Sequence, residues 1–476
     1  MGTHSDTLRS IVAETTAKIH HYQSLLQKLL AKRDSAQLEL DSLAYPILTL
    51  PPEITSEIFL HSLPTSYGDC ERNAANPREA PMLLCYVCRT WREIALSTPA
   101  LWTTIDLHIS DIECAEIFQA WLDRAGAFPL FVKLKISGDL EDDVVGGIFK
   151  TLASRSRTVQ SLELRASVEH LRYMEDADEH WSFPLLQMLC ISSWDAEDAD
   201  EEDLIKTFTN FPLLREASLS QTPPSLIPLP WHQLIKLTAA FDTLADCLEV
   251  LRLSPNLAEY SFTLTDDDAF ADLTALIHSN LQSLSLLENA SIMFAGITGI
   301  LDYLSLPALQ TLHIVDSESD ESNWQEILEG FLTRSSSPPL RKFAVHLPST
   351  DFEPAMFLNM PYLVDLQIWN PSRSFIEDFC DSFIVRDPRF LPQLQHLAFL
   401  GCESPPPAYD MLDIAYSGLA ERWRARHDTG FAELKSFRLV WARDFGSLHE
   451  DALSPFQELV AEGMDIHIQG QSISYI

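Results

Sequence analysis

The sequence predicts an α/β protein in which a long N-terminal helix and a small helical unit precede a solenoid of stacked strand-and-helix repeats. Three observations predict this fold: an apolar phrase with the spacing LxxLxL that recurs twelve times, helical patterns between the phrases, and a heptad stripe near the N-terminus. A chain of 476 residues is too long for one compact core. We therefore expect a heptad helix over residues 1–45, a helical domain over 46–108 and the solenoid over 109–476.

The recurring phrase defines the predicted repeats. Its first apolar positions lie 20 to 31 residues apart, apart from a last gap of 40 that holds an insertion around Pro405–Pro407. This spacing suits the period of leucine-rich repeats. Several phrases follow a proline, which ends a helix and leads into an extended strand. The first residues of the twelve phrases are Phe131, Val159, Leu186, Leu214, Leu234, Leu257, Leu281, Leu309, Leu340, Leu363, Leu394 and Leu434.

Helical patterns separate the phrases, as in Glu113–Arg124, Leu204–Phe208, Phe270–His278 and Trp324–Leu332. A unit of one short strand and one helix cannot bury its apolar face alone, so neighbouring units must stack. Stacking predicts a leucine-rich-repeat-like solenoid with a parallel sheet on its concave face and helices on its convex face, ended by a strand at Met464–Ile468. A doubly wound sheet is less favoured, because the 15 glycines include no glycine-rich phosphate turn.

Residues 8–43 carry an apolar stripe in alternating steps of four and three, which is typical of a coiled coil. Two interpretations remain open: a coiled-coil homodimer through residues 8–43, or one amphipathic helix folded onto its own domain. The stripe consists of Leu8, Val12, Thr15, Ile19, Tyr22, Leu26, Leu29, Arg33, Ala36, Leu40 and Leu43.

A second helical unit follows Tyr45-Pro46, where the residue before proline is pushed out of the helical region. The segment LPPEITSEIFLHSL starts a helix at its prolines, and residues 64–81 form a polar loop. A further helix is expected from Met82 to Ile94, and Pro99–Trp102 closes the unit. Because Leu83 and Leu84 are adjacent, they cannot both face one narrow interior.

The segments LPPEITSEIFLHSL and PMLLCYVCRTWREIALSTPALW resemble the F-box family, in the variety with an N-terminal helix and degenerate leucine-rich repeats that is abundant in mushroom-forming fungi. The resemblance implies a small helical unit whose apolar face packs against the Skp adaptor of a cullin-RING ubiquitin ligase. It implies adaptor-binding residues at Leu50, Pro51, Ile54, Ile58, Phe59, Leu83, Leu84, Val87, Cys88 and Trp91. From the residues alone, the unit could instead be a helical cap on the repeats.

Charge and cysteine usage narrow the partners. The formal charge of −36 repels nucleic-acid phosphates and anionic lipid surfaces, so neither nucleic acid nor a membrane is an expected partner. The N-terminus lacks the apolar run of a signal peptide, and the least polar stretch, Asn289–Leu301, is too short to span a bilayer. Scattered cysteines suit a reducing compartment. We expect a cytoplasmic or nuclear protein, and the acidic run Asp195–Asp203 could attract a basic partner.

No motif predicts an enzyme, a metal or a cofactor. The sequence contains no nucleophile elbow, no paired metal histidines and no phosphate loop. The pair Cys85 and Cys88 has no second ligand pair at metal spacing, and the resemblance places a cysteine before the tryptophan of an F-box at Cys88.

The predicted function is therefore a substrate-receptor subunit of a Skp-cullin-F-box ligase, which binds the adaptor through the helical unit and an unknown protein substrate through the repeats. The alternative is a scaffold outside the ligase that self-associates through its N-terminal helix. Substrate contacts are expected on the concave strands, at residues such as Glu163, Arg165, Ser218, Ser261, Ser285, His313, Gln367 and Arg438.

Overall fold

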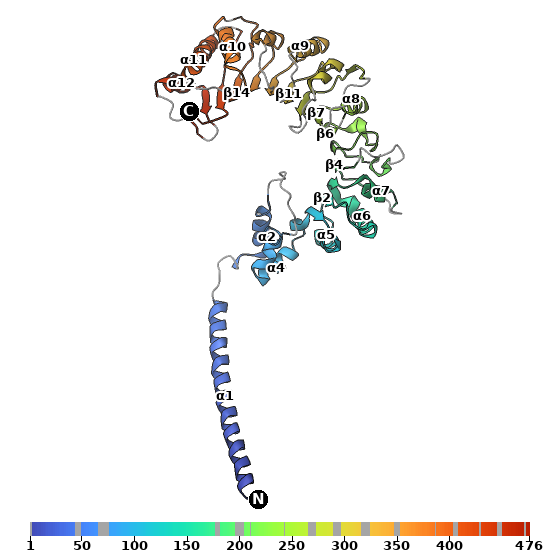
Figure 1. Cartoon of the computed structure of the whole chain (residues 1–476), viewed down its shortest axis with the longest axis vertical. Coiled ribbons are helices and arrows are strands. Elements are labelled where there is room, and N and C mark those ends of the chain that lie inside the picture. Colours follow the sequence, from blue (N-terminus) through green and yellow to red (C-terminus); the bar gives the residue numbers. More distant parts are fainter. Residues whose placement is uncertain are drawn as a thin grey trace. The chain divides into compact units, whose positions relative to one another are not determined.

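The computed structural model divides the chain into two compact units, Met1–Trp102 and Thr103–Ile476 (Figure 1). The described residues are 2–42, 49–64, 76–176, 181–195, 204–209, 211–241, 243–264, 273–288, 297–315, 324–346, 353–385, 387–402, 408–427, 430–444, 450–470 and 473–476.

The first unit begins with the predicted long helix, α1 (Gly2–Ser42). Its described side chains from Thr7 to Glu39 are all exposed. An ion pair between Lys18 and Glu14 (2.7 Å), one turn apart, lies on its surface. The predicted boundary at Tyr45-Pro46 lies outside the described residues.

Three short α-helices follow in the described remainder of this unit. α2 (Pro52–His61) starts at the prolines, as predicted, because proline fixes a helical φ and needs no backbone donor in the first turn. The single helix predicted from Met82 to Ile94 is wrong: α3 (Met82–Val87) and α4 (Arg89–Leu96) are separated by Cys88. Cys88 has extended backbone angles, φ −158° and ψ 171°, and its sulfur accepts a hydrogen bond from the Trp91 N–H that begins α4. A 3-10 turn, Pro99–Trp102, follows.

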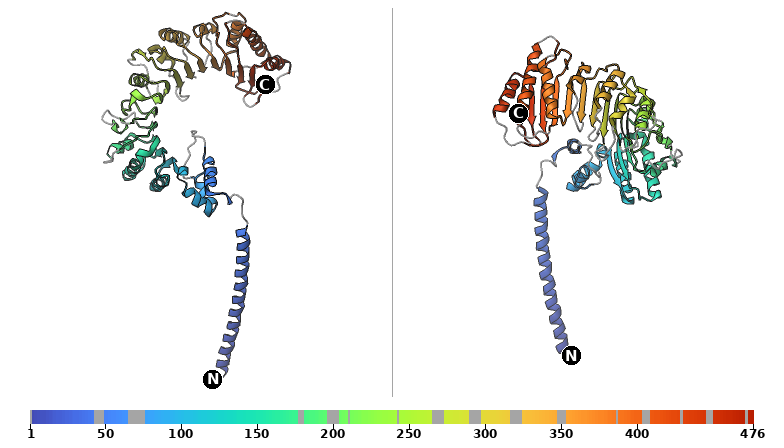
Figure 2. Two further views of the ribbon diagram at one scale, coloured as in Figure 1. Left: turned by 180° about the vertical axis from the view of Figure 1, so that it is seen from behind. Right: turned by 45° about the horizontal axis from the view of Figure 1, so that its top comes forward.

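The second unit contains a parallel sheet whose fourteen strands follow one another in chain order. This confirms the predicted solenoid. Figure 2 shows that the strands lie on the inner side of the curved array of repeats and the helices on its outer side. The strands are β1 (Thr104–Ile109), β2 (Leu130–Ile136), β3 (Val159–Arg165), β4 (Met188–Ser192), β5 (Glu216–Ser220), β6 (Lys236–Phe241), β7 (Glu259–Leu264), β9 (Ser283–Glu288), β11 (Thr311–Val315), β12 (Lys342–His346), β13 (Asp365–Trp369), β14 (His396–Cys402), β15 (Ser436–Trp441) and β16 (Asp465–Gln469).

The solenoid begins earlier than predicted. β1 pairs in parallel with β2, so the boundary expected at 108/109 lies at Trp102/Thr103. Residues Trp102, Ile105 and Leu107 follow the LxxLxL spacing with tryptophan in first place, and all three are buried.

Helices cover the outer face of the sheet, but not in every repeat. They are α5 (Ile112–Ala125), α6 (Asp142–Arg155), α7 (Val168–Asp176), α8 (Leu244–Leu253), α9 (Trp324–Arg334), α10 (Arg373–Val385), α11 (Ala408–Arg424) and α12 (Glu450–Ala461). Between β5 and β6 the chain forms only a 3-10 turn, Trp231–Gln233, because four prolines between residues 223 and 230 exclude an α-helix.

Two predicted helices differ from the structure. The pattern at Leu204–Phe208 forms a 3-10 turn, Lys206–Thr209. The described part of Phe270–His278 is extended: β8 (Leu276–Ile277) pairs with β10 (Leu304–Ser305). His278, which is buried, fixes this segment, because its N–H donates to the Ser305 carbonyl (3.0 Å) and its Nε2 lies 2.9 Å from the Ser254 carbonyl oxygen. Tertiary pairing thus overrides the local helical pattern.

The core lies between the sheet and its outer layer of helices. Every phrase residue that was predicted to face the core is buried, with one exception. Phe131 is 38% exposed, because β2 alternates regularly and turns Leu130 and Val132 inward on either side of it. Toward the C-terminal end, Phe379 of α10 is surrounded by phenylalanine rings, with centroids 5.1 Å away at Phe383 and 5.6 Å away at Phe399.

The last residues of the chain fold back on β16. The Tyr475 N–H donates to the Ile468 carbonyl (2.8 Å), the Ile468 N–H donates to the Ile476 carbonyl (3.2 Å), and Gln469 and Ser474 form an antiparallel bridge. These bonds engage backbone groups of β16, the strand at the edge of the sheet. In the described part of the chain, none of the helices has the length and apolar character required to cross a bilayer.

Candidate functional site

The helical unit contains the residues that were predicted to bind an adaptor, and the structure separates them into a buried, an exposed and a partly exposed group. Phe59 and Leu84 are core residues, at 1% and 6% exposure, so their predicted place on a docking face is wrong. Their helical faces turn inward, where the ring of Phe59 packs edge-on against Trp91 with centroids 4.9 Å apart. Leu83 and Leu84 were predicted not to face the same interior, and Leu84 is indeed buried while Leu83 is 43% exposed.

The remaining apolar residues stay open to solvent. Ile54 and Ile58 are 51% and 42% exposed on one face of α2, where their spacing of four residues places them one turn apart. Leu83 and Val87 have the same spacing on α3, with Val87 at 53%. Leu50 and Pro51 are exposed where α2 begins. We call Leu50, Pro51, Ile54, Ile58, Leu83 and Val87 the docking residues.

Cys88 and Trp91 serve the architecture of the unit. The Cys88 sulfur lies 3.5 Å from the Trp91 backbone nitrogen and caps α4, and both residues are only partly exposed. The indole of Trp102 donates to the Ala95 carbonyl (2.9 Å) and closes the end of this small core. Among the described residues, no cluster of histidine, cysteine and carboxylate side chains is suited to a metal ion.

Sequence reasoning missed two exposed apolar residues in this unit. Tyr86 of α3 is 60% exposed and Leu96 of α4 is 42% exposed. Tyr86 lies three residues after Leu83, so helical spacing could have added it to the predicted face.

The second candidate surface is the inner face of the sheet, opposite the helices. The concave residues named from the sequence do lie on this face, because each alternates with a buried leucine, isoleucine or phenylalanine along its strand. Three rows of side chains cross the strands: a proximal row where strands begin, such as Asp365 and Ser436; a central row, such as Gln367 and Arg438; and a distal row, such as Trp369 and Leu400.

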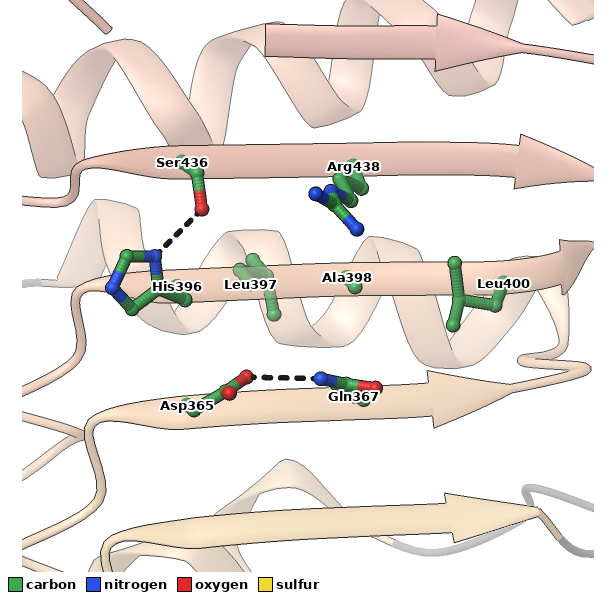
Figure 3. A pocket seen from close by; sticks show the side chains of 8 residues that line it. All are labelled: Asp365, Gln367, His396, Leu397, Ala398, Leu400, Ser436 and Arg438. Carbon is green, nitrogen blue, oxygen red and sulfur yellow. Dashed lines mark hydrogen bonds between the residues drawn. The ribbon is translucent and has the colours of Figure 1, made fainter. Parts of the chain in front are cut away.

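Strands β13, β14 and β15 enclose a hollow of about 190 Å³ on this face. Figure 3 shows its lining residues: Asp365, Gln367, His396, Leu397, Ala398, Leu400, Ser436 and Arg438. At one end, His396 Nδ1 and Ser436 Oγ lie 2.7 Å apart, and Gln367 donates to the Asp365 carboxylate (3.3 Å). These contacts engage the proximal row, while Figure 3 shows the Arg438 guanidinium apart from them, on the side of β15 that faces the strand of Ala398.

An aromatic and imidazole group lies on the neighbouring strands β11, β12 and β13. His346 lies beside Trp369 with ring centroids 5.9 Å apart, and the Asn370 amide donates to His346 Nε2 (2.9 Å). Burial lowers the pKa of His346, and burial together with the neighbouring His346 lowers the pKa of His313. Both rings are therefore mostly neutral at pH 7. Gly401, at φ +67°, makes room for this arrangement, since a Cβ there would lie 2.5 Å from Asn370 Oδ1.

Two side chains of the second unit that could have been functional, Asp195 and Cys190, are engaged within the fold. Asp195, the first residue of the acidic run, accepts hydrogen bonds from the Val168 N–H (2.8 Å), where α7 begins, and from the Ser193 hydroxyl (2.7 Å). Residues 196–203 lie outside the described residues. Burial raises the pKa of the Cys190 thiol to about 11, so this inner-face cysteine is protonated and a poor nucleophile at neutral pH.

Comparisons with known proteins give no family for this chain. No family model matches it, and no curated protein matches it. A crystal structure of a Bacteroides fragilis protein from the Northeast Structural Genomics Consortium is similar over 60% of this chain and 65% of its own, at 14% identity and a TM-score of 0.31. The match thus spans less than two thirds of that protein.

Proposed function

We propose that the chain is a substrate-receptor subunit of a Skp-cullin-F-box ubiquitin ligase. The observation that carries the proposal is the set of exposed docking residues on α2 and α3, in the segment whose sequence resembles an F-box. On this proposal the adaptor covers these side chains, and the inner face of the solenoid holds a protein substrate.

The energetics favour a partner for this surface. Exposed isoleucine, leucine and valine side chains order water around them, and covering each half-exposed side chain contributes on the order of 1 kcal/mol. The core beneath them is already complete, since Phe59 and Trp91 pack together inside the unit. Covering the docking residues therefore requires no refolding.

The receptor itself performs no bond-breaking step. It holds substrate lysines near a ubiquitin thioester carried by another subunit, which raises their effective concentration. The ligase proposal therefore requires two separate surfaces on one chain, and the docking residues and the inner face are two such surfaces.

Capture of purified Skp adaptor and cullin by the full chain tests the proposal. We expect the double variant Ile54→Asp, Ile58→Asp to lose adaptor capture, because two carboxylates would be desolvated at the interface. Both side chains are exposed, so the variant should keep its circular dichroism and melting temperature.

The matched control is Ile112→Asp, which changes an isoleucine that is 62% exposed at the start of α5 in the other unit. It should capture adaptor as well as the original chain does. Undiminished capture by the double variant, or no capture by the original chain, would refute the ligase proposal.

Self-association through α1 is a second candidate function, favoured by one observation. The heptad stripe is open from Leu8 to Ala36, with Leu26 and Leu29 at 57% and 56% exposure. A second copy of the helix would bury this stripe as a coiled coil.

Sedimentation equilibrium distinguishes this candidate. We expect a mass of two chains for the original protein and one chain for Leu26→Asp, Leu29→Asp, whereas the off-stripe control Gln27→Asp, Ala31→Asp stays dimeric. A monomeric original protein would exclude the dimer and leave the adaptor test unaffected.

A further inference from the structure

The inner face of the sheet is unusually poor in acidic groups for so acidic a chain. From β4 to β16, the described positions of the central and distal rows contain no aspartate or glutamate, although the chain has 69 acidic residues. The central row reads Cys190, Ser218, Thr238, Ser261, Ser285, His313, Ala344, Gln367, Ala398, Arg438 and His467. The distal row reads Ser192, Ser220, Ala240, Thr263, Leu287, Val315, His346, Trp369, Leu400, Val440 and Gln469.

Most acidic residues elsewhere on the inner face form an ion pair or a hydrogen bond with a neighbouring side chain. In the proximal row, Glu259 pairs with Lys236 (3.6 Å), Asp465 with His467 (3.1 Å), and Asp365 accepts from Gln367. The fourth acidic residue of the proximal row, Glu216 on β5, is the cross-strand register partner of Lys236 on β6.

The first three strands have mixed charge. Glu163 of β3 pairs with Lys133 of β2 (3.1 Å), and Lys133 is also the register partner of Asp106. The negative charge of the chain is therefore carried mainly outside the central and distal rows of β4 to β16.

Arg438 is the fixed positive charge of this part of the face. Its side chain is exposed, and within the described residues the guanidinium has no hydrogen bond or ion pair. The central-row neighbours across the sheet are Ala398 and His467, and the imidazole of His467 is held by Asp465. The N–H groups of the Arg438 guanidinium are therefore free to donate, and two of them can bond to the two oxygens of one carboxylate.

Apolar and aromatic groups lie beside this arginine. Leu400 lines the same hollow, and Trp369, which is 39% exposed, is the register partner of Leu400 on the next strand. Strands in a sheet lie about 4.8 Å apart, so Trp369 stands roughly 10 Å from the strand of Arg438. Residues i and i+2 of an extended peptide are about 7 Å apart. The side chains of such a bound peptide can therefore reach both Trp369 and Arg438.

We propose that the inner face at β13, β14 and β15 binds a protein segment in which an aspartate or glutamate neighbours an apolar or aromatic residue, with the carboxylate on Arg438 and the apolar side chain on Leu400 and Trp369. The inference rests on the proposed receptor function and names its substrate class. The net charge of the chain favours a basic partner, but the groups of this face favour an acidic one.

A carboxylate fits this site better than a phosphate does. One guanidinium balances the single charge of one carboxylate, whereas a phosphate carries close to two negative charges and is usually held by several cations. The rings of His313 on β11 and His346 on β12 do not supply a second cation, because burial keeps them mostly neutral at pH 7.

Selection from a phage-displayed library of random dodecapeptides on the immobilised full chain tests the inference. We expect enrichment of peptides with aspartate or glutamate beside tryptophan, phenylalanine or leucine. A synthetic peptide from the selection should bind Arg438→Gln about tenfold more weakly in fluorescence polarisation, which corresponds to loss of one charge-assisted pair.

The matched control is Arg165→Gln, which removes another exposed arginine of the distal row, on β3. It should bind the peptide as the original chain does. Enrichment of basic or phosphorylated sequences in parallel selections, no enrichment at all, or unchanged binding by Arg438→Gln would overturn the inference. Adaptor capture does not involve Arg438, so Arg438→Gln that still captures adaptor separates failure of this inference from failure of the ligase proposal.

Discussion

Adjacent residues in the helical unit have opposite roles. Ile58 is 42% exposed and Phe59 is 1% exposed, although the sequence pattern placed both on one docking face. A helical stripe is about 100° wide, so residues at its border fall on either side according to the partner helix, which one sequence does not specify. The exposed docking residues could be predicted from the sequence, and the burial of Phe59 and Leu84 could not.

Phe59→Ala should therefore destabilise the unit where Ile58→Ala does not. Truncating a buried phenylalanine costs about 3–5 kcal/mol, whereas an exposed isoleucine costs less than about 1 kcal/mol. We expect backbone amides of α2 and α4 to exchange hydrogen at least about a hundredfold faster in Phe59→Ala, measured by mass spectrometry. Equal exchange in the two variants would contradict the core assignment.

Two partly buried histidines on β11 and β12 link stability to pH. Burial lowers the pKa of His313 and of His346 from the usual value of 6.5. A lowered folded-state pKa means that protonation favours the unfolded chain, so this contribution is fully present above pH 6.5 and is lost as pH falls through the folded values.

NMR titration of the imidazole carbons, with His313→Gln and His346→Gln for assignment, should give midpoints below 6.5 for both rings. The free energy of unfolding should fall less between pH 7 and pH 5 in the double glutamine variant than in the original chain. Midpoints at or above 6.5 would contradict the burial argument.

At the scale of elements, strands were easier to predict than the segments between them. The leucines at LxxLxL spacing fix which residues of each strand face the core, and this also fixes the composition of the inner face. β1 was missed because Trp102 occupies the first leucine position of its phrase. The break between α3 and α4 depends on a single cap at Cys88, and four prolines leave only a 3-10 turn between β5 and β6.

Helices α10 and α11 approach closely at Gly418. A Cβ at this position would lie 2.7 Å from the Cβ of Cys380 and 2.9 Å from its Cα. Gly418→Ala should therefore lower the free energy of unfolding by about 1–3 kcal/mol through overpacking, although alanine is intrinsically the better helix former by about 1 kcal/mol.

The control for this prediction is Gly146→Ala in α6, where a Cβ would meet no atom within 4 Å. It should raise stability by up to about 1 kcal/mol. Urea denaturation followed by circular dichroism measures both variants, and a stabilising Gly418→Ala would show that the two helices can separate at little cost.

At the scale of the whole molecule, the strand order follows the chain order, so each strand of the sheet pairs only with its neighbours along the sheet. Stability in such arrays is close to a sum of repeat and interface terms, and regions can unfold separately. The sequence predicts this architecture well, because the same local pattern recurs in each repeat. It does not predict the partner, because the repeats vary in the solvent-facing residues that contact it.

We therefore expect equilibrium unfolding of the chain to depart from two-state behaviour. The phenylalanine cluster around Phe379 should protect the C-terminal repeats, so that amides of β13 and β14 exchange more slowly in intermediate urea than those of β5 and β6. Superimposable transitions by fluorescence, circular dichroism and hydrogen exchange would contradict this expectation.

The fold-back of residues 473–476 onto β16 affects how the sheets of different molecules can associate. A parallel sheet that ended in an unpaired strand would offer a row of free amides and carbonyls to the opposite sheet edge of another molecule, and molecules joined head to tail in this way grow into filaments. The bonds from Tyr475 and to Ile476 occupy part of that edge. Residues 473–476 therefore reduce the number of backbone groups on β16 that are free to pair with the sheet of another molecule.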